Sequence, residues 1–355
     1  MKERMEQIRA SLAVNEAALI ESGANRFYLT GFESSAGHVL VTPQNAYFII
    51  DFRYVEKARA TVKTAEVILQ ENTEEQIGRL LAQDGATHLY VEADSTPLSR
   101  FAALREALPA VTLCNGDKID RALVDARAIK TREELASMKA AQQMTDETFT
   151  YILDRITPGR TEREVMLDME FYMRRLGSEG VSFDFIVVSG KNSSLPHGVP
   201  TDKKIERGEF VTMDFGAVVN GYHSDMTRTV AVASVSEEQK RVYDTVYAAQ
   251  KAALDFIRPG VSCIEVDRVA RDLIYGAGYE GCFGHGLGHS VGVEIHEMPA
   301  CNMRCKEILR PGIVMTVEPG IYLENKFGVR IEDMVYLTEN GAENLTKSEK
   351  KLLIV

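Results

Sequence analysis

Polar and hydrophobic positions along residues 1–125 switch repeatedly between a helical and a strand period. Apolar side chains three or four residues apart predict helices at 2–16, 73–84 and 97–107. Short runs rich in Val, Ile, Leu and aromatic residues predict strands at 39–43, 46–52, 66–70 and 88–93. Helices and strands that alternate in this way predict a small α/β domain. We find no catalytic group of side chains in it.

A second domain is predicted at residues 126–355, joined to the first through 118–130. Thr131-Arg132-Glu133-Glu134 is a capping-box signature and predicts the start of a long helix. The segments ITPGRTEREV (156–165) and IRPGVSCIEV (257–266) then form an internal repeat. Each places Pro-Gly after a helix and Ser/Thr-x-x-Glu before the next one. We therefore expect a duplicated helix–helix–strand unit with pseudo-twofold symmetry, and a site on the sheets between its halves.

Two aspartates flank the clearest turn signal in the chain, within VTMDFGAVVNGYHSDMTRT. Asn220-Gly221 separates two apolar-rich runs, and both residue types tolerate positive φ, so the pair predicts a β-hairpin. Asp214 then lies opposite Thr227, and Asp225 opposite Gly216, with the two aspartates on one face about 7 Å apart. This pair either lies on a solvated hairpin face or holds cations; two metal ions ~3.5–4 Å apart would fit between them.

Further candidate ligands follow in three motifs. Three histidines, His285, His289 and His296, lie in GHGLGHSVGVEIHE. Glu318 lies in TVEPGIY, and Glu332 lies in GVRIEDMVYLT. Each glutamate occupies a strand-like run in which an apolar residue is usual. One such glutamate would be interpreted as a partnered structural acid, but four acids with glycine-flanked histidines indicate a metal centre.

Charge and ligand chemistry limit which metal ions this centre can bind. Two Asp, two Glu and one His form an oxygen-rich set with one nitrogen, which suits Mn, Co or Zn. Four carboxylates and two divalent ions have no net charge, whereas the carboxylates alone repel one another. The predicted cofactor is therefore a pair of divalent metal ions, with manganese as the first candidate and cobalt or zinc as alternatives.

The chain resembles the metal-dependent peptidases of the pita-bread fold, which include aminopeptidase P, prolidase (Xaa-Pro dipeptidase) and methionine aminopeptidase. The three motifs above, the hairpin run and FDFIVVSGKNSSLPHGVP carry this resemblance, in the family's order, over residues 180–337. The first domain resembles the N-terminal domain of the aminopeptidase P, prolidase and creatinase branch. This resemblance is carried by NRFYLTGFESSAGHVLVTP and IIDFRYVEKA. The resemblance implies a creatinase-like α/β domain followed by a pita-bread catalytic domain.

Carried over residue by residue, the resemblance implies a metal-binding set of Asp214, Asp225, His289, Glu318 and Glu332. Asp214 would bind one ion, His289 and Glu318 the other, and Asp225 and Glu332 would bridge them.

The resemblance also implies substrate-side roles for His197, His285, His296, Tyr322 and Arg330. Two cations that share a water would lower its pKa enough to provide hydroxide near neutral pH. His296 or His197 would stabilise the oxyanion, and Glu318 would carry the proton to the leaving nitrogen. The alternative for Arg330 is a structural role in an ion pair with Asp333.

The implied reaction is hydrolysis of the Xaa-Pro bond, in dipeptides or at the N-terminus of short peptides with proline second. Proline lacks the N–H by which most peptidases hold a substrate, so this bond needs a dedicated site. Prolidases of similar length carry an arginine four residues after the histidine that matches His296, where this chain has Ala300. Arg304 could replace it only if the loop bends back. The missing arginine favours longer substrates, and the compact length favours dipeptides.

Two other interpretations stay open: a non-catalytic peptide-binding module and a creatinase-like hydrolase on the same fold. Cys282, Cys301 and Cys305 lie near the histidine motif, but Cys-x3-Cys with one nearby His lacks the spacing of structural zinc sites. We interpret them as structural thiols. His38 and His223 match no functional position and are expected to be structural.

Composition limits the partners. A net charge of −11 argues against nucleic acid and anionic membranes. Residues 1–20 contain charges throughout and have no signal-peptide core, and no apolar run approaches the ~18 residues of a membrane span. We therefore expect a cytoplasmic enzyme. The resemblance adds a homodimer.

Overall fold

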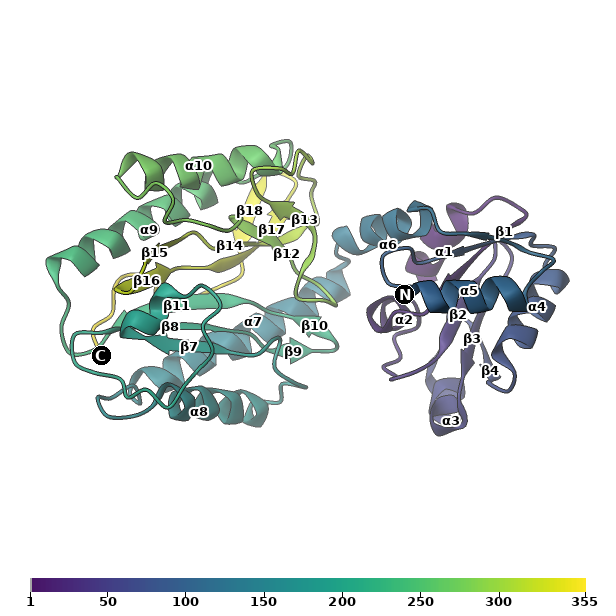
Figure 1. Cartoon of the computed structure of the whole chain (residues 1–355), viewed down its shortest axis with the longest axis horizontal. Helices are drawn as coiled ribbons and strands as arrows, with labels where there is room; N and C mark the ends of the chain where they lie inside the picture. Colours follow the sequence, from purple (N-terminus) through teal and green to yellow (C-terminus); the bar gives the residue numbers. More distant parts are fainter. Residues whose placement is uncertain (1) are drawn as a thin grey trace. The chain divides into compact units, whose positions relative to one another are not determined.

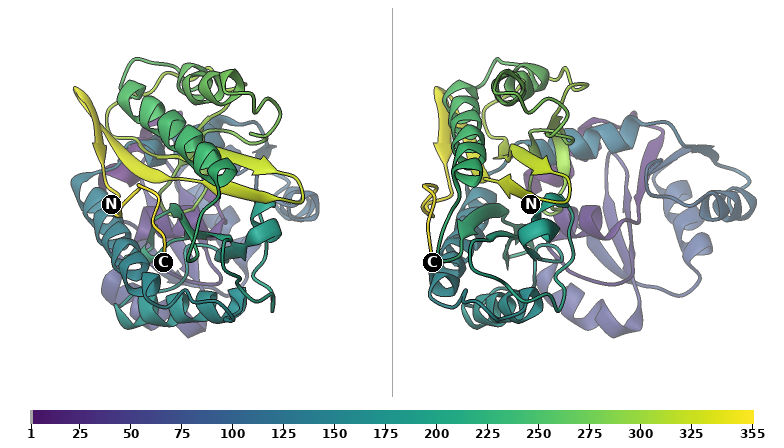
Figure 2. Two further views of the ribbon diagram at one scale, coloured as in Figure 1. Left: turned by 90° about the vertical axis from the view of Figure 1, so that its left-hand side faces the viewer. Right: turned by 60° about the vertical axis from the view of Figure 1, so that its left-hand side comes forward.

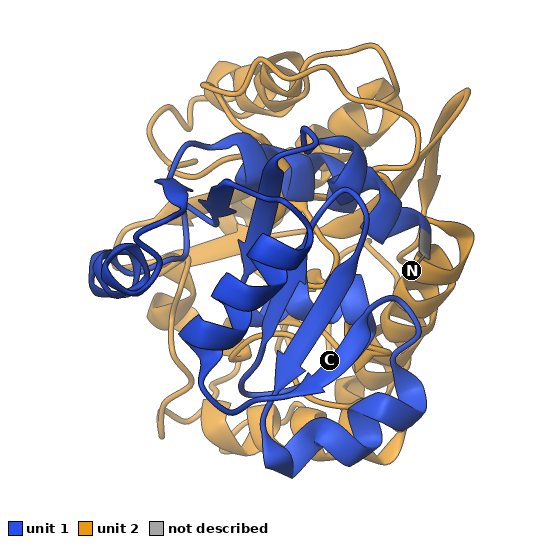
Figure 3. Cartoon of the chain, turned by 90° about the vertical axis from the view of Figure 1, so that its right-hand side faces the viewer, with its two compact units in different colours: residues 1–127 blue, residues 128–355 orange. Residues whose placement is uncertain are grey.

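The computed structural model describes residues 2–355, and the chain divides into two compact units. The first ends at Arg127, and the second, which begins at Ala128, extends to Val355 (Figure 3). The boundary expected from the sequence lies two residues earlier, inside helix α6 (Lys118–Ala128).

The first unit, referred to as unit 1, is an α/β domain built on one mixed sheet. Its helices are α1 (Lys2–Ala10), α2 (Gly23–Thr30), α3 (Phe52–Thr61), α4 (Thr73–Gln83), α5 (Leu98–Ala107) and α6. Its strands are β1 (Glu16–Ile20), β2 (His38–Val41), β3 (Ala46–Ile50), β4 (Glu66–Leu69), β5 (His88–Val91) and β6 (Thr112–Cys114). The sheet order is β4-β3-β2-β1-β5-β6; β2 is antiparallel to both β1 and β3, and the other pairs are parallel.

The helix predicted at 2–16 is wrong in its second half. The helix ends at Ala10, and Glu16–Ile20 forms β1, the strand between β2 and β5. Glu, Ala and Leu are good helix formers, so the local signal favoured a longer helix. Burial against neighbouring strands on both sides overrides it, since Ala17 to Ile20 are each at most 1% exposed.

The second unit, referred to as unit 2, contains the repeated elements. Its helices are α7 (Arg132–Leu153), α8 (Glu162–Arg175), α9 (Glu237–Phe256), α10 (Cys263–Gly276) and the 3₁₀ helix η1 (Gly190–Ser194). The strands of its first half are β7 (Ile186–Ser189), β8 (Phe210–Phe215), β9 (Val218–Val219), β10 (Tyr222–His223) and β11 (Met226–Ala231). Those of its second half are β12 (Gly288–Ser290), β13 (Glu297–Cys301), β14 (Val314–Val317), β15 (Gly320–Leu323), β16 (Phe327–Arg330), β17 (Asp333–Thr338) and β18 (Gly341–Asn344).

Within unit 2, helices lie outside and strands lie between them. Figures 1 and 2 show α7 and α8 on one side, α9 and α10 on the opposite side, and the sheets in the middle. A three-stranded sheet has the order β11-β8-β7, a five-stranded sheet has the order β13-β12-β14-β17-β18, and β9 with β10 and β15 with β16 form two-stranded sheets. Each half has its own apolar core, one around Met169 and Met213 and the other around Val266 and Met315.

The predicted internal repeat is present in the backbone. Thr161 and Ser262 both complete capping boxes at the start of α8 and α10. Just before them, the N–H of Gly159 donates to Ile205, and that of Gly260 donates to Leu309, each at 2.9 Å. The two Pro-Gly turns therefore bond to equivalent loops of the two halves. Among the described helices, none combines the length and the apolar character that crossing a bilayer requires.

Candidate metal centre

The Asn-Gly hairpin forms as predicted and brings the two aspartates together. Asn220 and Gly221 have φ of 51° and 71°, the positive values that a tight turn between strands needs. Asp214 pairs with Thr227 in the β8–β11 ladder, and Val219 pairs with Tyr222 next to the turn. The two strands therefore keep the same pairing register on both sides of Asp225. The carboxylates of Asp214 and Asp225 consequently lie on the same face of the hairpin.

The second half of unit 2 supplies the other candidate ligands. His289 lies in β12, Glu318 directly follows β14, and Glu332 lies between β16 and β17. The backbone N–H of Glu332 donates to the carbonyl of Thr227 at 3.1 Å, so the two halves are joined beside the site.

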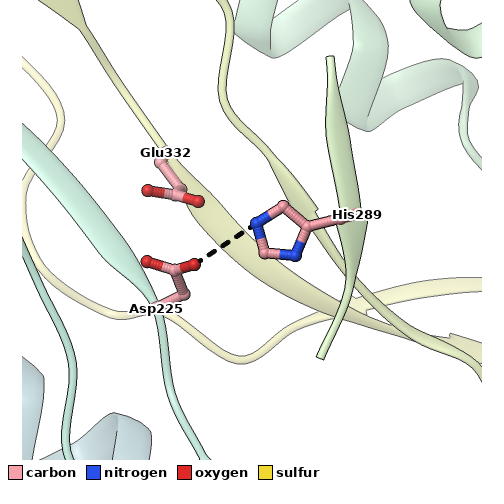
Figure 4. A group of neighbouring side chains, drawn as sticks. All are labelled: Asp225, His289 and Glu332. Atoms are coloured by element: carbon pink, nitrogen blue, oxygen red, sulfur yellow. Dashed lines mark ion pairs between the residues drawn. The ribbon is translucent and has the colours of Figure 1, made fainter. Parts of the chain in front are cut away.

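Three of the five predicted ligands form a tight group. Asp225, His289 and Glu332 each offer a ligand atom, and these atoms all lie within 4.8 Å of one another (Figure 4). The Nε2 atom of His289 lies 3.6 Å from Oδ2 of Asp225 and 3.5 Å from Oε1 of Glu318. Asp214 lines the same cavity, so the five side chains converge on one place.

The donor set fits hard divalent cations. Asp225 and Glu332 are 4% and 1% exposed. One carboxylate oxygen of Asp214 and one of Asp225 are buried and receive no hydrogen bond from the described part of the chain. Buried carboxylate oxygens without a donor are costly unless a cation takes the donor's place.

Electrostatics support the same fit. Burial, followed by the charges of Glu332 and Asp214, raises the pKa of Asp225 well above its usual range. Burial and the charge of Asp214 raise the pKa of Glu318 to about 8 against the opposing effect of Arg330. Burial lowers the pKa of His289 to about 4, which keeps its imidazole neutral and able to act as a ligand. The acids repel one another in the absence of positive charge, as expected for a metal site.

Arg330 connects Asp214 of this cluster to Tyr322 and Thr227. Its guanidinium donates to Asp214 at 2.6 Å, to the hydroxyl of Tyr322 at 2.8 Å and to the hydroxyl of Thr227 at 3.0 Å. The alternative pairing of Arg330 with Asp333 is wrong, because Asp333 accepts from Arg228 at 2.8 Å and from Lys350 at 2.6 Å.

The remaining predicted residues lie around the same cavity or against its wall. The cavity has a volume of about 740 Å³, and its lining includes His197, His285, His296 and Ala300. The ring of His296 packs edge-on against that of His289, with centroids 4.5 Å apart. The ring of His285 hydrogen-bonds the Tyr322 hydroxyl at 2.9 Å, and burial lowers the pKa of His285 to about 4.

Two threonines that orient the glutamates were not predicted from the sequence. Thr227 donates to Glu332 at 2.7 Å, and Thr316 donates to Glu318 at 3.3 Å. Both could have been found from strand parity, since Thr227 is two residues after Asp225 and Thr316 two before Glu318. His38 and His223 lie elsewhere: His38 bonds Glu21 in unit 1, and His223 bonds Ser182.

Comparison with known families decides the classification. The model of metallopeptidase family M24 matches residues 136–339, and that of the creatinase/prolidase N-terminal domain matches residues 4–126. The chain belongs to metallopeptidase family M24. The pita-bread fold and the creatinase-like first domain expected from the sequence are thereby confirmed.

Relatives within family M24 match the chain over nearly its whole length. A protein named Xaa-Pro dipeptidase from Pyrococcus horikoshii is 36% identical over 356 residues, which cover 99% of each chain. The solved structure of an Xaa-Pro dipeptidase from Bacillus anthracis is 39% identical, with a TM-score of 0.95 and 99% of each chain covered. That of an X-Pro aminopeptidase from Thermotoga maritima is 35% identical, with a TM-score of 0.92, 100% of this chain covered and 99% of that chain.

Proposed function

We propose that this M24 member is a two-metal peptidase that hydrolyses the bond between an N-terminal residue and proline. The observation that carries the proposal is the convergence of acids and one neutral imidazole in a cavity of about 740 Å³. Full-length relatives named Xaa-Pro dipeptidase and X-Pro aminopeptidase support the choice of bond.

The proposed metal ligands are Asp214, Asp225, His289, Glu318 and Glu332. When bound, two divalent cations lower the pKa of water and polarise a carbonyl oxygen. Manganese is our first candidate, with cobalt or zinc as alternatives, because these ions accept carboxylate and imidazole together. Each glutamate accepts a hydrogen bond from a threonine hydroxyl, which orients its carboxylate for binding.

Residues around the cluster would bind substrate and move protons. Glu318 would take a proton from water and deliver it to the proline nitrogen, which has none of its own. His296 and His197 line the cavity and would donate to the developing oxyanion. His285, Tyr322 and Arg330 form one hydrogen-bonded chain that would hold the substrate in place.

Substrate length is the finer part of the proposal. Ala300 and Asn302 belong to the cavity wall, whereas Arg304 is exposed and is not among the described lining residues. A methyl group cannot bind the free carboxylate of a dipeptide as a guanidinium would. We therefore propose that peptides longer than two residues are accepted. A homodimer and a cytoplasmic location stay predictions.

Metal removal tests the mechanism. We expect dialysis against a chelator to abolish cleavage of Ala-Pro-Ala and Ala-Pro, and Mn, Co or Zn to restore it. Asp214→Asn should lower kcat/KM by at least ~100-fold, because it weakens a ligand, while Asp255→Asn on the exposed face of α9 should not. Cleavage that survives chelation would contradict the metal mechanism, and equally fast cleavage of Ala-Ala-Ala would contradict the preference for proline.

A further inference from the structure

The loop between β12 and β13 is folded around a single carboxylate. The backbone N–H groups of Val293 and Glu294 donate to Oε1 of Glu297 at 3.0 and 3.3 Å. Gly292 packs so closely against this carboxylate that a Cβ there would lie 2.4 Å from Oε2 of Glu297. Its carbonyl also accepts the N–H of His223 at 2.9 Å. The carboxylate of Glu297 therefore determines the path of this loop.

A lysine far away in the sequence neutralises that carboxylate. The ammonium of Lys130 donates to Oε2 of Glu297 at 3.0 Å, and the two side chains are 1% and 3% exposed. The backbone N–H of Lys130 donates to Gly312 at 2.8 Å, which fixes the lysine from the other end. Desolvation offsets much of the attraction within a buried pair, so a gain in stability is a poor explanation for this one. Removal of one partner would nevertheless leave an uncompensated buried charge.

The same loop carries His296, which directly precedes Glu297. His296 lines the cavity, and its ring contacts that of His289. Glu297 also pairs with Ser290, the residue after His289, at a register shift in the β12–β13 ladder. A change at Glu297 would therefore reach His296 through one peptide bond.

We propose that Lys130 is a positioning residue for His296, which it holds toward the cavity through its buried ion pair with Glu297. This inference rests on the substrate-side role of His296 in the proposed function. Lys130 does not line the cavity, so we attribute its effect on turnover to the loop and not to a contact with substrate.

Kinetics with a second variant separate positioning from general stability. We expect Lys130→Met to lower kcat/KM for Ala-Pro-Ala by roughly 10- to 100-fold, the scale of small misplacements in active sites. In a His296→Ala background the same substitution should cost almost nothing more, because the group that it positions is gone. Equal losses in both backgrounds, or no loss in either, would overturn the proposal.

Charge rescue gives a further check. The double variant Lys130→Met/Glu297→Gln buries no charge, and its amide oxygen can still accept the N–H groups of Val293 and Glu294. We expect it to recover most of the lost kcat/KM; a double variant as poor as Lys130→Met would count against the ion pair. Lys203→Met is the control, because it breaks the partly exposed Lys203–Glu209 pair, 2.6 Å long, whose members do not line the cavity.

Hydrogen exchange measures the loop without any assumption about substrate. Lys130→Met should accelerate amide exchange in peptides that contain Val293 and Glu294, and Lys203→Met should not. Unchanged exchange in that loop would overturn the positioning role even if the wild-type protein cleaved no Xaa-Pro peptide. Loss of wild-type activity alone would count against the proposed function and leave the exchange result to decide this one.

Discussion

Hydrogen bonds from neighbouring side chains orient the acids of the candidate metal centre. Arg330 holds Asp214, Thr227 holds Glu332 and Thr316 holds Glu318, each through one carboxylate oxygen. Each of these bonds limits the rotation of its carboxylate, so a cation would find the candidate ligands already arranged. Arg330 makes the most contacts of the three, since its guanidinium donates to Asp214, Thr227 and Tyr322.

Replacing Arg330 by lysine tests this arrangement. A lysine retains the charge but cannot donate to Asp214, Thr227 and Tyr322 at once. Loss of a hydrogen bond to a charged group costs about 1.5–3 kcal/mol, so kcat/KM should fall roughly 10- to 150-fold. Steady-state kinetics at saturating Mn would measure the loss, with circular dichroism to check folding. Arg268→Lys on the exposed face of α10 is the control, and comparable activities of the two variants would refute the role.

Residue types and strand parity explain which site residues the sequence could reveal. Carboxylates in apolar strands are conspicuous, so the four acids could be named from their positions, whereas the choice of His289 among three histidines depended on the family resemblance. The pairing of Arg330 with Asp333 failed because residues three apart in extended chain point to opposite sides. Asp333 instead meets Arg228, 1% exposed, whose guanidinium also bonds the carbonyls of Thr227 and Glu332. An arginine in a strand gives no local sign that it is buried.

At the scale of elements, local signals predicted helix starts better than strand partners. The capping boxes at Thr131, Thr161 and Ser262 are all present, because each depends on residues only three apart. The sheet order, in contrast, depends on contacts across the whole unit. Strand β1 was missed for that reason: its residues favour a helix, and only the neighbouring strands β2 and β5 make it extended.

A glycine in β12 provides a test at this scale. A Cβ at Gly288 would lie 2.1 Å from the carbonyl oxygen of Thr316, so alanine there must push β12 away from β14. We expect Gly288→Ala to displace His289 and weaken Mn binding by tenfold or more, since overpacking costs about 1–3 kcal/mol. Calorimetric titration with Mn would measure this. Gly284→Ala, in the same motif but with nothing within 4 Å of its Cβ, should bind Mn normally; equal affinities would contradict the argument.

At the scale of the whole molecule, the candidate site is built from residues of unit 2. The ligands and the cavity lining belong to residues 163–332 of unit 2. Unit 1 has its own core, around Leu19, Ile49 and Leu89, and its own charged cluster. In that cluster Glu21 accepts from His38 at 2.6 Å and from Arg100 at 2.8 Å. The α/β class of this unit followed from alternating patterns, but the Glu21 cluster joins three distant segments and could not be predicted from them.

The Glu21 cluster should make unit 1 sensitive to acid. Burial alone would raise the pKa of Glu21, but hydrogen bonds and charge from His38 and Arg100 lower it to about 2. A folded-state pKa below the unfolded value of 4.5 stabilises the fold above pH 4.5, and this stabilisation is lost as the pH falls toward 2.

Glu21→Gln should therefore lower the free energy of unfolding by on the order of 2 kcal/mol at pH 7, a figure reduced for partial solvent screening. The deficit should shrink steadily between pH 4.5 and 2, because the wild-type carboxylate becomes protonated there and loses the same interactions. Urea unfolding followed by circular dichroism suits a chain without tryptophan. Glu56→Gln on the exposed face of α3 should show no deficit at any pH. A deficit for Glu21→Gln that stayed constant down to pH 2 would indicate lost packing and would argue against a charged interaction.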